Sequence, residues 1–95
     1  MIHYILTKYQ AGYLTDEQFQ ELASSFHKVA KHIDGISSCT VKRNIVVRDT
    51  NMDVMVSFHF DSPDLLGTYL KHPLHLEIAE KNDPYIIQRV SFDCE

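Results

Sequence analysis

Apolar residues recur along the chain with two different spacings, which predict strands and helices in alternation. Residues 2–9 are rich in β-branched and aromatic side chains, and both alternating sets contain apolar residues, which predicts a strand covered on both faces. From Thr15 a capping-box sequence is followed by apolar residues at intervals of three and four, which predicts an amphipathic helix ended by Gly35. The apolar positions of this helix are Phe19, Leu22, Ala23, Phe26, Val29, Ala30 and Ile33.

A hairpin of two strands is predicted in the middle of the chain. Residues 36–47 form a strand with a weaker, partly polar pattern, and residues 48–51 have the composition of a turn. The next strand begins at Asp53, and one of its faces is plainly apolar. The residues on that face are Val54, Val56, Phe58 and Phe60.

Two helical segments are predicted next. Ser62 and Pro63 suit the cap and the first position of a helix. Its buried stripe is expected to be Leu65, Leu66, Tyr69 and Leu70. Pro73 disfavours helical geometry at His72 but can itself begin a second helix, which runs to about Asn82.

Residues 85–94 predict the last strand, so the order is strand, helix, strand, strand, helix, strand. The expected faces of this strand are Ile86, Val90 and Phe92 on one side and Tyr85, Ile87, Arg89 and Ser91 on the other. This order is typical of the ferredoxin-like α+β class, βαββαβ with a four-stranded antiparallel sheet, in which both helical segments cover one face. The other face is too apolar to remain in water, which predicts a homodimer with two sheets packed back to back as a dimeric α/β barrel. That face would carry Ile2, Tyr4, Leu6, Met55, His59 and Ile87, or the alternate set.

Composition and charge exclude several classes of partner. A chain of 95 residues with 44% apolar and 23% charged residues predicts one globular domain over residues 1–95. The net charge is −4 and the cations form no cluster that could neutralise a row of phosphates, so we expect no nucleic-acid partner. No apolar run is long enough to span a bilayer, so no membrane association is expected.

The cysteine content favours a reducing compartment. Cys39 and Cys94 are too few for a disulfide scaffold, and the first residues do not resemble a signal peptide, so we expect a cytoplasmic protein. Because the two cysteines fall in strands at opposite edges of the expected sheet, no disulfide within the chain is expected.

Several motifs together resemble one known family. They are His3, Lys8, RNxxxR (Arg43, Asn44, Arg48) leading to Asp53, the segment SFHFDSPDLLGTYL, then HPLH and a terminal FDCE. Over nearly the whole chain this pattern resembles the stress-responsive A/B barrel (Dabb) family. The resemblance implies a dimeric α+β barrel with a pocket in each protomer between the helices and the sheet. It implies less about function, because the family includes plant stress proteins, uncharacterised bacterial proteins and a few polyketide cyclases.

The cyclase members of this family suggest candidate catalytic residues. In those enzymes the tyrosine and the last histidine of YxxHPxH carry the chemistry, and they match Tyr69 and His75. A histidine in the first strand of those enzymes is matched by His3. A further histidine in their third strand falls at Val54, so this chain departs from the cyclase pattern there.

Tyr69 and His75 support two interpretations. An imidazole beside a phenol can act as a general base with an oxyanion donor, for example in an aldol-type reaction that needs no cofactor. Alternatively, Tyr69 packs in the core with its hydroxyl satisfied, and His75 bonds to backbone near the start of the helix. For catalysis we favour the second interpretation.

The remaining histidines are expected to have structural roles. His72 precedes a proline, so we expect it to be extended and to cap the next helix. A metal site would need His72 and His75 to be joined by His3 or Glu77, and two histidines across a proline are weak support for the three ligands that such a site needs, so no metal is predicted. No chemical role is expected for His27, His32 and His59, of which His59 should face the dimer interface or its rim.

The arginines of RNxxxR are also expected to be structural. Asn44 tolerates turn geometry, and an arginine near a strand junction usually pairs with a carboxylate, here Asp53 or Asp49.

The sequence therefore predicts a homodimeric stress-response A/B barrel protein that binds a small apolar or aromatic ligand. The predicted lining of its pocket is His3, Ile5, Ala23, Phe26, Val54, Val56, Tyr69 and His75. The alternative is a cofactor-independent enzyme that resembles a polyketide cyclase or lyase, with His75 as the base, Tyr69 as the oxyanion donor and His3 as a third member. A related family of similar barrels implies cofactor-free monooxygenase chemistry as a variant. No cofactor is predicted in any case.

Overall fold

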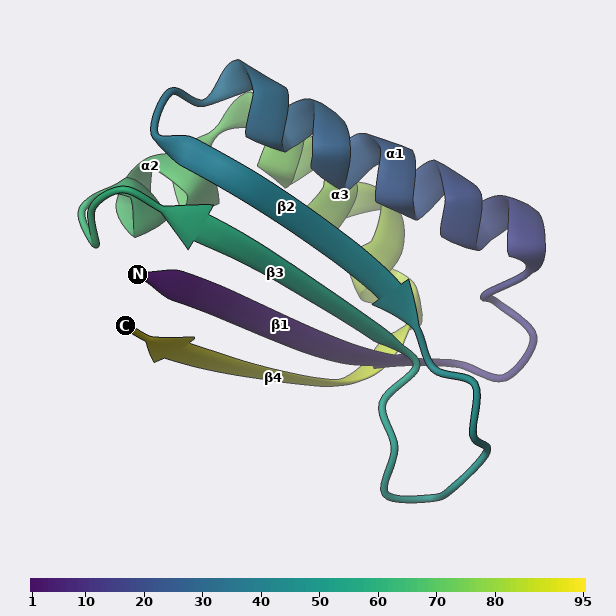
Figure 1. Cartoon of the computed structure of the whole chain (residues 1–95). Helices are drawn as coiled ribbons and strands as arrows, with labels where there is room; N and C mark the ends of the chain where they lie inside the picture. Colours follow the sequence, from purple (N-terminus) through teal and green to yellow (C-terminus); the bar gives the residue numbers. More distant parts are fainter.

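The computed structural model describes all 95 residues and shows a four-stranded sheet with its helices on one face (Figure 1). The strands lie in the order β2-β3-β1-β4, and each neighbouring pair is antiparallel. The predicted ferredoxin-like α+β fold is therefore confirmed. The elements are β1 (Ile2–Tyr9), α1 (Asp16–His32), β2 (Ile36–Arg43), β3 (Val54–Phe60), α2 (Leu65–Lys71), α3 (Pro73–Asn82), the 3₁₀ helix η1 (Asp83–Tyr85) and β4 (Ile86–Cys94).

The core lies between the inner face of the sheet and the helices. The four apolar residues predicted for one face of β3 are all buried there, with exposed fractions of 0–2%. Because side chains alternate along a strand, β1 places His3, Thr7 and Tyr9 on the same inner face, and all three are buried. The residues of α1 that are buried against this face are Leu22, Phe26 and Val29. The predicted Thr15 cap is confirmed, since its hydroxyl accepts from the Gln18 amide at 3.1 Å.

β2 is shorter than predicted. It ends at Arg43, and residues 44–53 form a loop that projects from the end of the sheet, with Ile45 and Val47 exposed at 93% and 101% (Figure 1). The side chain of Asn44 explains the break, because its Nδ2 donates to the Val46 carbonyl at 2.6 Å in competition with strand pairing. The prediction of a strand to residue 47 and a four-residue turn is therefore wrong.

α2 begins at Leu65, two residues later than predicted. A turn precedes it, in which the Leu65 amide donates to the Ser62 carbonyl at 3.1 Å. Tyr69 is buried as predicted, with 1% of its surface exposed, but Leu70 is 46% exposed. The burial predicted for Leu70 is wrong: its side chain lines the cavity and, unlike Leu65 and Leu66, is not packed against the core.

The stretch YLKHPLH interrupts and restarts the helix as predicted. His72 has extended backbone angles, with φ −66° and ψ 137°, and Pro73 is the first residue of α3. The Nδ1 atom of His72 accepts from the Leu74 amide at 3.1 Å, which confirms the predicted cap. The change of direction brings Tyr69 of α2 and His75 of α3 together, with ring centroids 4.4 Å apart.

The alternation predicted for β4 is wrong at its first residues. The register between β1 and β4 shifts between Lys8 and Tyr9, which is the signature of a bulge. As a result Ile86 lines the inner side together with Arg89, although the simple alternation had placed them on opposite faces.

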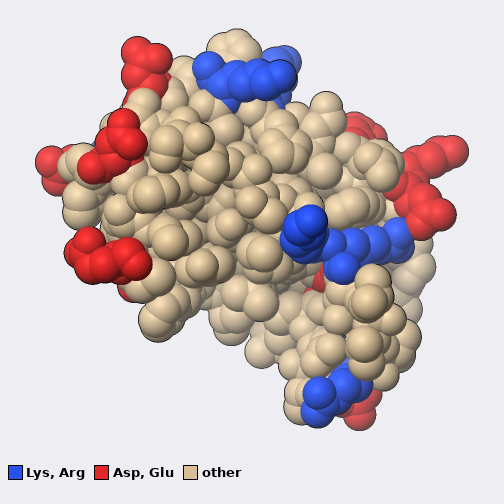
Figure 2. Space-filling view, viewed as in Figure 1, with Lys and Arg blue, Asp and Glu red and all other residues tan.

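The outer face of the sheet is apolar and has no cover within the chain. Ile2, Tyr4 and Leu6 run along its centre, because the alternate residues of β1 point inward. Tyr4 lies opposite Phe92 and Leu6 opposite Val90, and these two β4 side chains are 63% and 42% exposed. Figure 2 shows this face with its charged residues mainly around the margin. On β1 and β3 the first of the two alternative outer sets lies outside, whereas on β4 the outer residues are Val90 and Phe92 and not the face that carries Arg89 and Ser91.

The ion pair of Arg43 differs from the predicted one. Arg43 pairs with Asp16 at 2.5 Å, so the predicted pairing with Asp49 or Asp53 is wrong. Asp53 instead accepts a hydrogen bond from the Tyr9 amide at 2.8 Å.

Both cysteines are free and lie in edge strands, as expected. None of the helices is long and apolar enough to cross a membrane.

Candidate functional site

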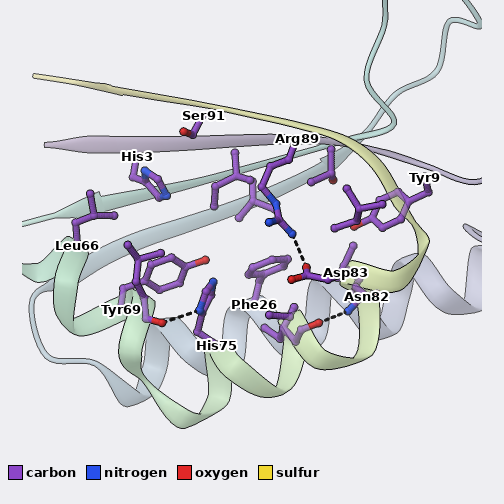
Figure 3. Close-up of a pocket in the computed structure, with 18 of the residues that line it drawn as sticks. His3, Tyr9, Phe26, Leu66, Tyr69, His75, Asn82, Asp83, Arg89 and Ser91 are labelled. Carbon is purple, nitrogen blue, oxygen red and sulfur yellow. Dashed lines mark hydrogen bonds and ion pairs between the residues drawn. The ribbon is translucent and has the colours of Figure 1, made fainter.

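A cavity of about 300 Å³ lies between the inner face of the sheet and helices α1, α2 and α3 (Figure 3). This volume is at the lower end of the range of about 300–1,000 Å³ found for small-molecule sites. Most of its lining is apolar, and the polar groups come from four places: β1, the α2–α3 corner, the C-terminal end of α3, and the edge strand β4 with η1. The polar and titratable lining residues used below are His3, Tyr69, His75, Asp83, Arg89 and Asp93.

Six of the eight residues predicted to line a pocket do line this cavity. They are His3, Ile5, Phe26, Val56, Tyr69 and His75. Ala23 and Val54 do not line it. Val54 is 2% exposed in the core, and its register partner Thr7 lines the cavity in its place. On α1 the lining comes from Leu22, the neighbour of Ala23.

The hydroxyl of Tyr69 is buried without a hydrogen-bond partner in the protein. The ring is held by Phe58 and Phe60, with centroid distances of 4.9 and 5.9 Å, so its position is fixed by packing. Burial raises the pKa of Tyr69 well above the ordinary value of 10.0, so the phenol stays protonated and can donate. The expectation that this hydroxyl is satisfied is therefore wrong.

His75 is held in one tautomer by the backbone. Its Nδ1 atom lies 3.1 Å from the carbonyl oxygen of Leu70, which confirms the predicted backbone bond. Because a carbonyl oxygen only accepts, Nδ1 carries the proton and Nε2 of the neutral ring is left with a free lone pair. Figure 3 shows the ring beside Tyr69 at the cavity wall.

Burial lowers the pKa of His75 below the ordinary value of 6.5. The charges of Arg89 and His3 lower the pKa further, whereas the bond to Leu70 and the carboxylate of Asp83 raise it. Burial is the largest of these causes, so the neutral ring predominates in the folded protein at neutral pH.

This shift predicts how stability depends on pH. The pKa of His75 is lower in the folded protein than in the unfolded chain. As the pH falls below 6.5, His75 is therefore protonated first in the unfolded chain, and the free energy of unfolding decreases. Urea unfolding at pH 8 and pH 5 is expected to show a larger loss for the wild type than for His75→Gln. His32→Gln is the matched control, since the Nδ1 of exposed His32 bonds a helix carbonyl, that of Lys28, at 2.9 Å. Equal losses in wild type and His75→Gln would contradict the shift.

His3 is paired with a residue that sequence reasoning gave no role. Its Nδ1 atom lies 2.5 Å from Oδ1 of Asp93, which faces it across the β1–β4 ladder. His3 is buried, and its ring centroid is 5.9 Å from that of Tyr69. The carboxylate fixes the orientation of the imidazole at the inner wall of the cavity.

Arg89 and Asp83 were also missed as cavity residues. Arg89 reaches from β4 into the cavity, where its guanidinium pairs with the carboxylate of Asp83 in η1 (Figure 3). The cross-strand register places Arg89 on the inner face, opposite the buried Thr7, but no apolar pattern in β4 indicates which of its faces is inside.

The other predicted groups lie outside this site. His27, His32 and His59 are exposed, and none of them lines the cavity. No group of three or more His, Cys, Asp or Glu side chains is placed to hold a metal ion. What the cavity offers chemically is a hydrogen-bond donor at Tyr69, a proton acceptor at His75 and a cation at Arg89.

The fold and the cavity together define an α+β protein of the ferredoxin-like class with an internal site between sheet and helices. A family model, the Stress responsive A/B Barrel Domain, matches residues 3–95, and the chain therefore belongs to this family. This confirms the family that the sequence motifs resemble. A comparison with curated protein sequences gives no match.

Solved structures support the same fold. A protein of Arabidopsis thaliana is 17% identical, with a TM-score of 0.82, and the match covers 99% of this chain and 92% of that one. A dimeric protein of unknown function from Bacteroides fragilis is 18% identical, with a TM-score of 0.83 and coverage of 99% and 93%. The hydroxynitrile lyase of Passiflora edulis is 14% identical, with a TM-score of 0.78 and coverage of 96% and 87%. At these identities the likeness shows the fold alone.

Proposed function

We propose that this chain forms a homodimer in which each protomer binds one small, largely apolar or aromatic molecule in the cavity. The observation that carries this proposal is the unpaired hydroxyl of Tyr69. Leaving a buried polar group without a partner costs about 1–3 kcal/mol, so the group is expected to have a use. A ligand with an oxygen or nitrogen acceptor would receive this hydrogen bond, and the apolar walls would enclose the rest of the molecule.

Self-association is supported by the outer face of the sheet. Phe92 and Val90 are exposed there beside Tyr4 and Leu6, and burying such a face against its own copy removes it from water on both protomers. Similar structures from Thermobifida fusca, Bacteroides fragilis and Jannaschia are described as dimeric ferredoxin-like proteins.

We also propose a reducing, cytoplasmic location. Both cysteines are free, and burial raises the pKa of the Cys39 thiol to about 11, which makes it unreactive.

Tyr69→Phe tests the role of the unpaired hydroxyl. Removing a hydroxyl that has no partner is expected to stabilise the ligand-free protein by about 1 kcal/mol. Tyr13→Phe is the matched control, because the Tyr13 hydroxyl donates to Oδ1 of Asn82 at 2.7 Å and its loss is expected to destabilise by about 1 kcal/mol. Urea unfolding of the three proteins measures both effects. If Tyr69→Phe is destabilised as Tyr13→Phe is, the hydroxyl is already satisfied and the proposal loses its main support.

A second candidate function is cofactor-independent proton transfer. The observation that favours it is the tautomer of His75, whose free Nε2 faces the cavity beside the phenol of Tyr69. In such a reaction Nε2 removes a proton from a carbon next to a carbonyl, and the Tyr69 hydroxyl donates to the oxyanion that forms. The resulting carbanion adds to a second carbonyl in an aldol-type step, and the imidazolium returns the proton to the new alkoxide. A lyase that catalyses the reverse of the aldol-type step would use the same two groups, His75 and Tyr69.

A further inference from the structure

Arg89 is the one arginine or lysine in the wall of a largely apolar cavity. Its side chain extends from the edge strand β4 towards Asp83 of η1, as Figure 3 shows. An ion pair that only joined β4 to η1 would not need to face the cavity. The guanidinium of Arg89 pairs with Asp83 and also lines the cavity. Its charge also acts on the groups further inside, since it lowers the pKa of both Tyr69 and His75.

The pair that Arg89 makes is weak. A single bond joins Nη2 to Oδ1 of Asp83, and the other N–H groups of the guanidinium make no hydrogen bond within the protein. Both side chains are about half exposed, at 49% and 46%, and ion pairs of this kind contribute about 0–1 kcal/mol. A planar carboxylate that binds two N–H groups in parallel makes a stronger contact.

The second carboxylate of the cavity does not compete for Arg89. Asp93 is bound to His3, so its charge is directed to that imidazole. Asp83 is the only acid paired with Arg89, and it lies at the C-terminal end of α3, where the helix dipole disfavours a negative charge. A ligand anion can therefore replace Asp83 at modest cost.

We propose that the ligand carries a carboxylate and that Arg89 binds it, displacing Asp83. This inference rests on the proposed binding function of the cavity. The ligand then spans two anchors: its carboxylate lies on Arg89 near the opening, and an acceptor group further along receives the hydrogen bond of Tyr69. A small aromatic or aliphatic carboxylic acid fits these contacts and the volume of about 300 Å³.

Isothermal titration calorimetry with matched acid and amide probes tests the inference. The probes are benzoate and benzamide, cinnamate and cinnamamide, and hexanoate and hexanamide, which have similar shapes and differ in charge. The wild type is expected to bind the acid of at least one pair more tightly than its amide. Arg89→Gln is expected to weaken acid binding about tenfold or more and to weaken amide binding much less, because only the acid loses a charge-assisted contact.

Two further variants separate binding from structure. Asp83→Asn removes the carboxylate that competes for Arg89 and is expected to tighten acid binding. If the Arg89–Asp83 pair is purely structural, the substitution weakens the pair and the affinity for acids does not increase. Arg48→Gln is the matched control, since it removes the same charge from the exposed loop of residues 44–53 and should leave acid binding unchanged.

The outcomes distinguish this inference from the function on which it rests. If acids and amides bind wild type equally well, or if Arg89→Gln weakens both alike, the carboxylate assignment is overturned and the binding function stands. If none of the six probes binds the wild type, the binding function and the assignment both fail.

Discussion

Leu6→Glu is expected to convert the protein from a dimer to a monomer at micromolar concentration. Leu6 lies at the centre of the outer face of the sheet, between Met55 of β3 and Val90 of β4. In a two-fold dimer the new carboxylate enters the interface twice, and each unpaired buried charge costs several kcal/mol. We therefore expect the dissociation constant to rise at least about 100-fold, since each factor of ten corresponds to about 1.4 kcal/mol. Sedimentation equilibrium measures the change.

A charge control separates the interface from general electrostatics. Gln20→Glu makes the same change in charge on the exposed side of α1, and it should leave the dimer intact. Circular dichroism would confirm that Leu6→Glu remains folded. A wild-type protein that sediments as a monomer, or a Leu6→Glu variant that sediments as a dimer, would refute back-to-back packing.

His75→Gln is expected to lower turnover by about 10²–10⁴-fold if the cavity performs proton transfer, which is the range contributed by a general base. The substitution removes the Nε2 lone pair and keeps a side chain that can bond the Leu70 carbonyl. The assay is condensation of a panel of polyketide-like carbonyl compounds, with Tyr69→Phe as a second variant that lacks the oxyanion donor. Because the neutral ring is the base, the rate should rise with pH through the lowered pKa of His75.

His32→Gln serves as the control for this experiment. His32 makes the same type of bond to a helix carbonyl, but it is exposed and lies outside the cavity, so its replacement should leave turnover unchanged. Equal turnover in the wild type, His75→Gln and Tyr69→Phe would remove these residues from catalysis. The binding function would then remain as the account of the cavity.

The fold could be predicted because local patterns and the global arrangement agree. The alternation of β3 and the three-and-four spacing of α1 each indicate one buried face, and the element order leaves few ways to bring those faces together. The restart at Pro73 was also predictable, since proline restricts the residue before it and suits the first helical position. The end of β2 was not, because the turn formed by the Asn44 side chain outweighed the apolar residues that follow it.

The candidate site could be predicted only in part. Motifs indicated His3, Tyr69 and His75, and these three side chains do lie together. Arg89 was missed because the inner positions of β4 carry Arg89, Ser91 and Asp93, and polar residues on the inner side of an edge strand leave no apolar pattern to mark that face. The unpaired hydroxyl of Tyr69 could not be foreseen either, since whether a group has a partner depends on every neighbour in three dimensions.

Native mass spectrometry tests the central claim most directly, because it reports the assembly and its ligands together. The protein, as purified and after incubation with the six acid and amide probes, is expected to appear as a dimer that carries two copies of the best-binding probe or of a co-purified molecule. Tyr69→Phe should remain a dimer and retain less of the same molecule. A monomer, or a dimer that retains none of these compounds, would contradict a homodimer with one binding cavity in each protomer.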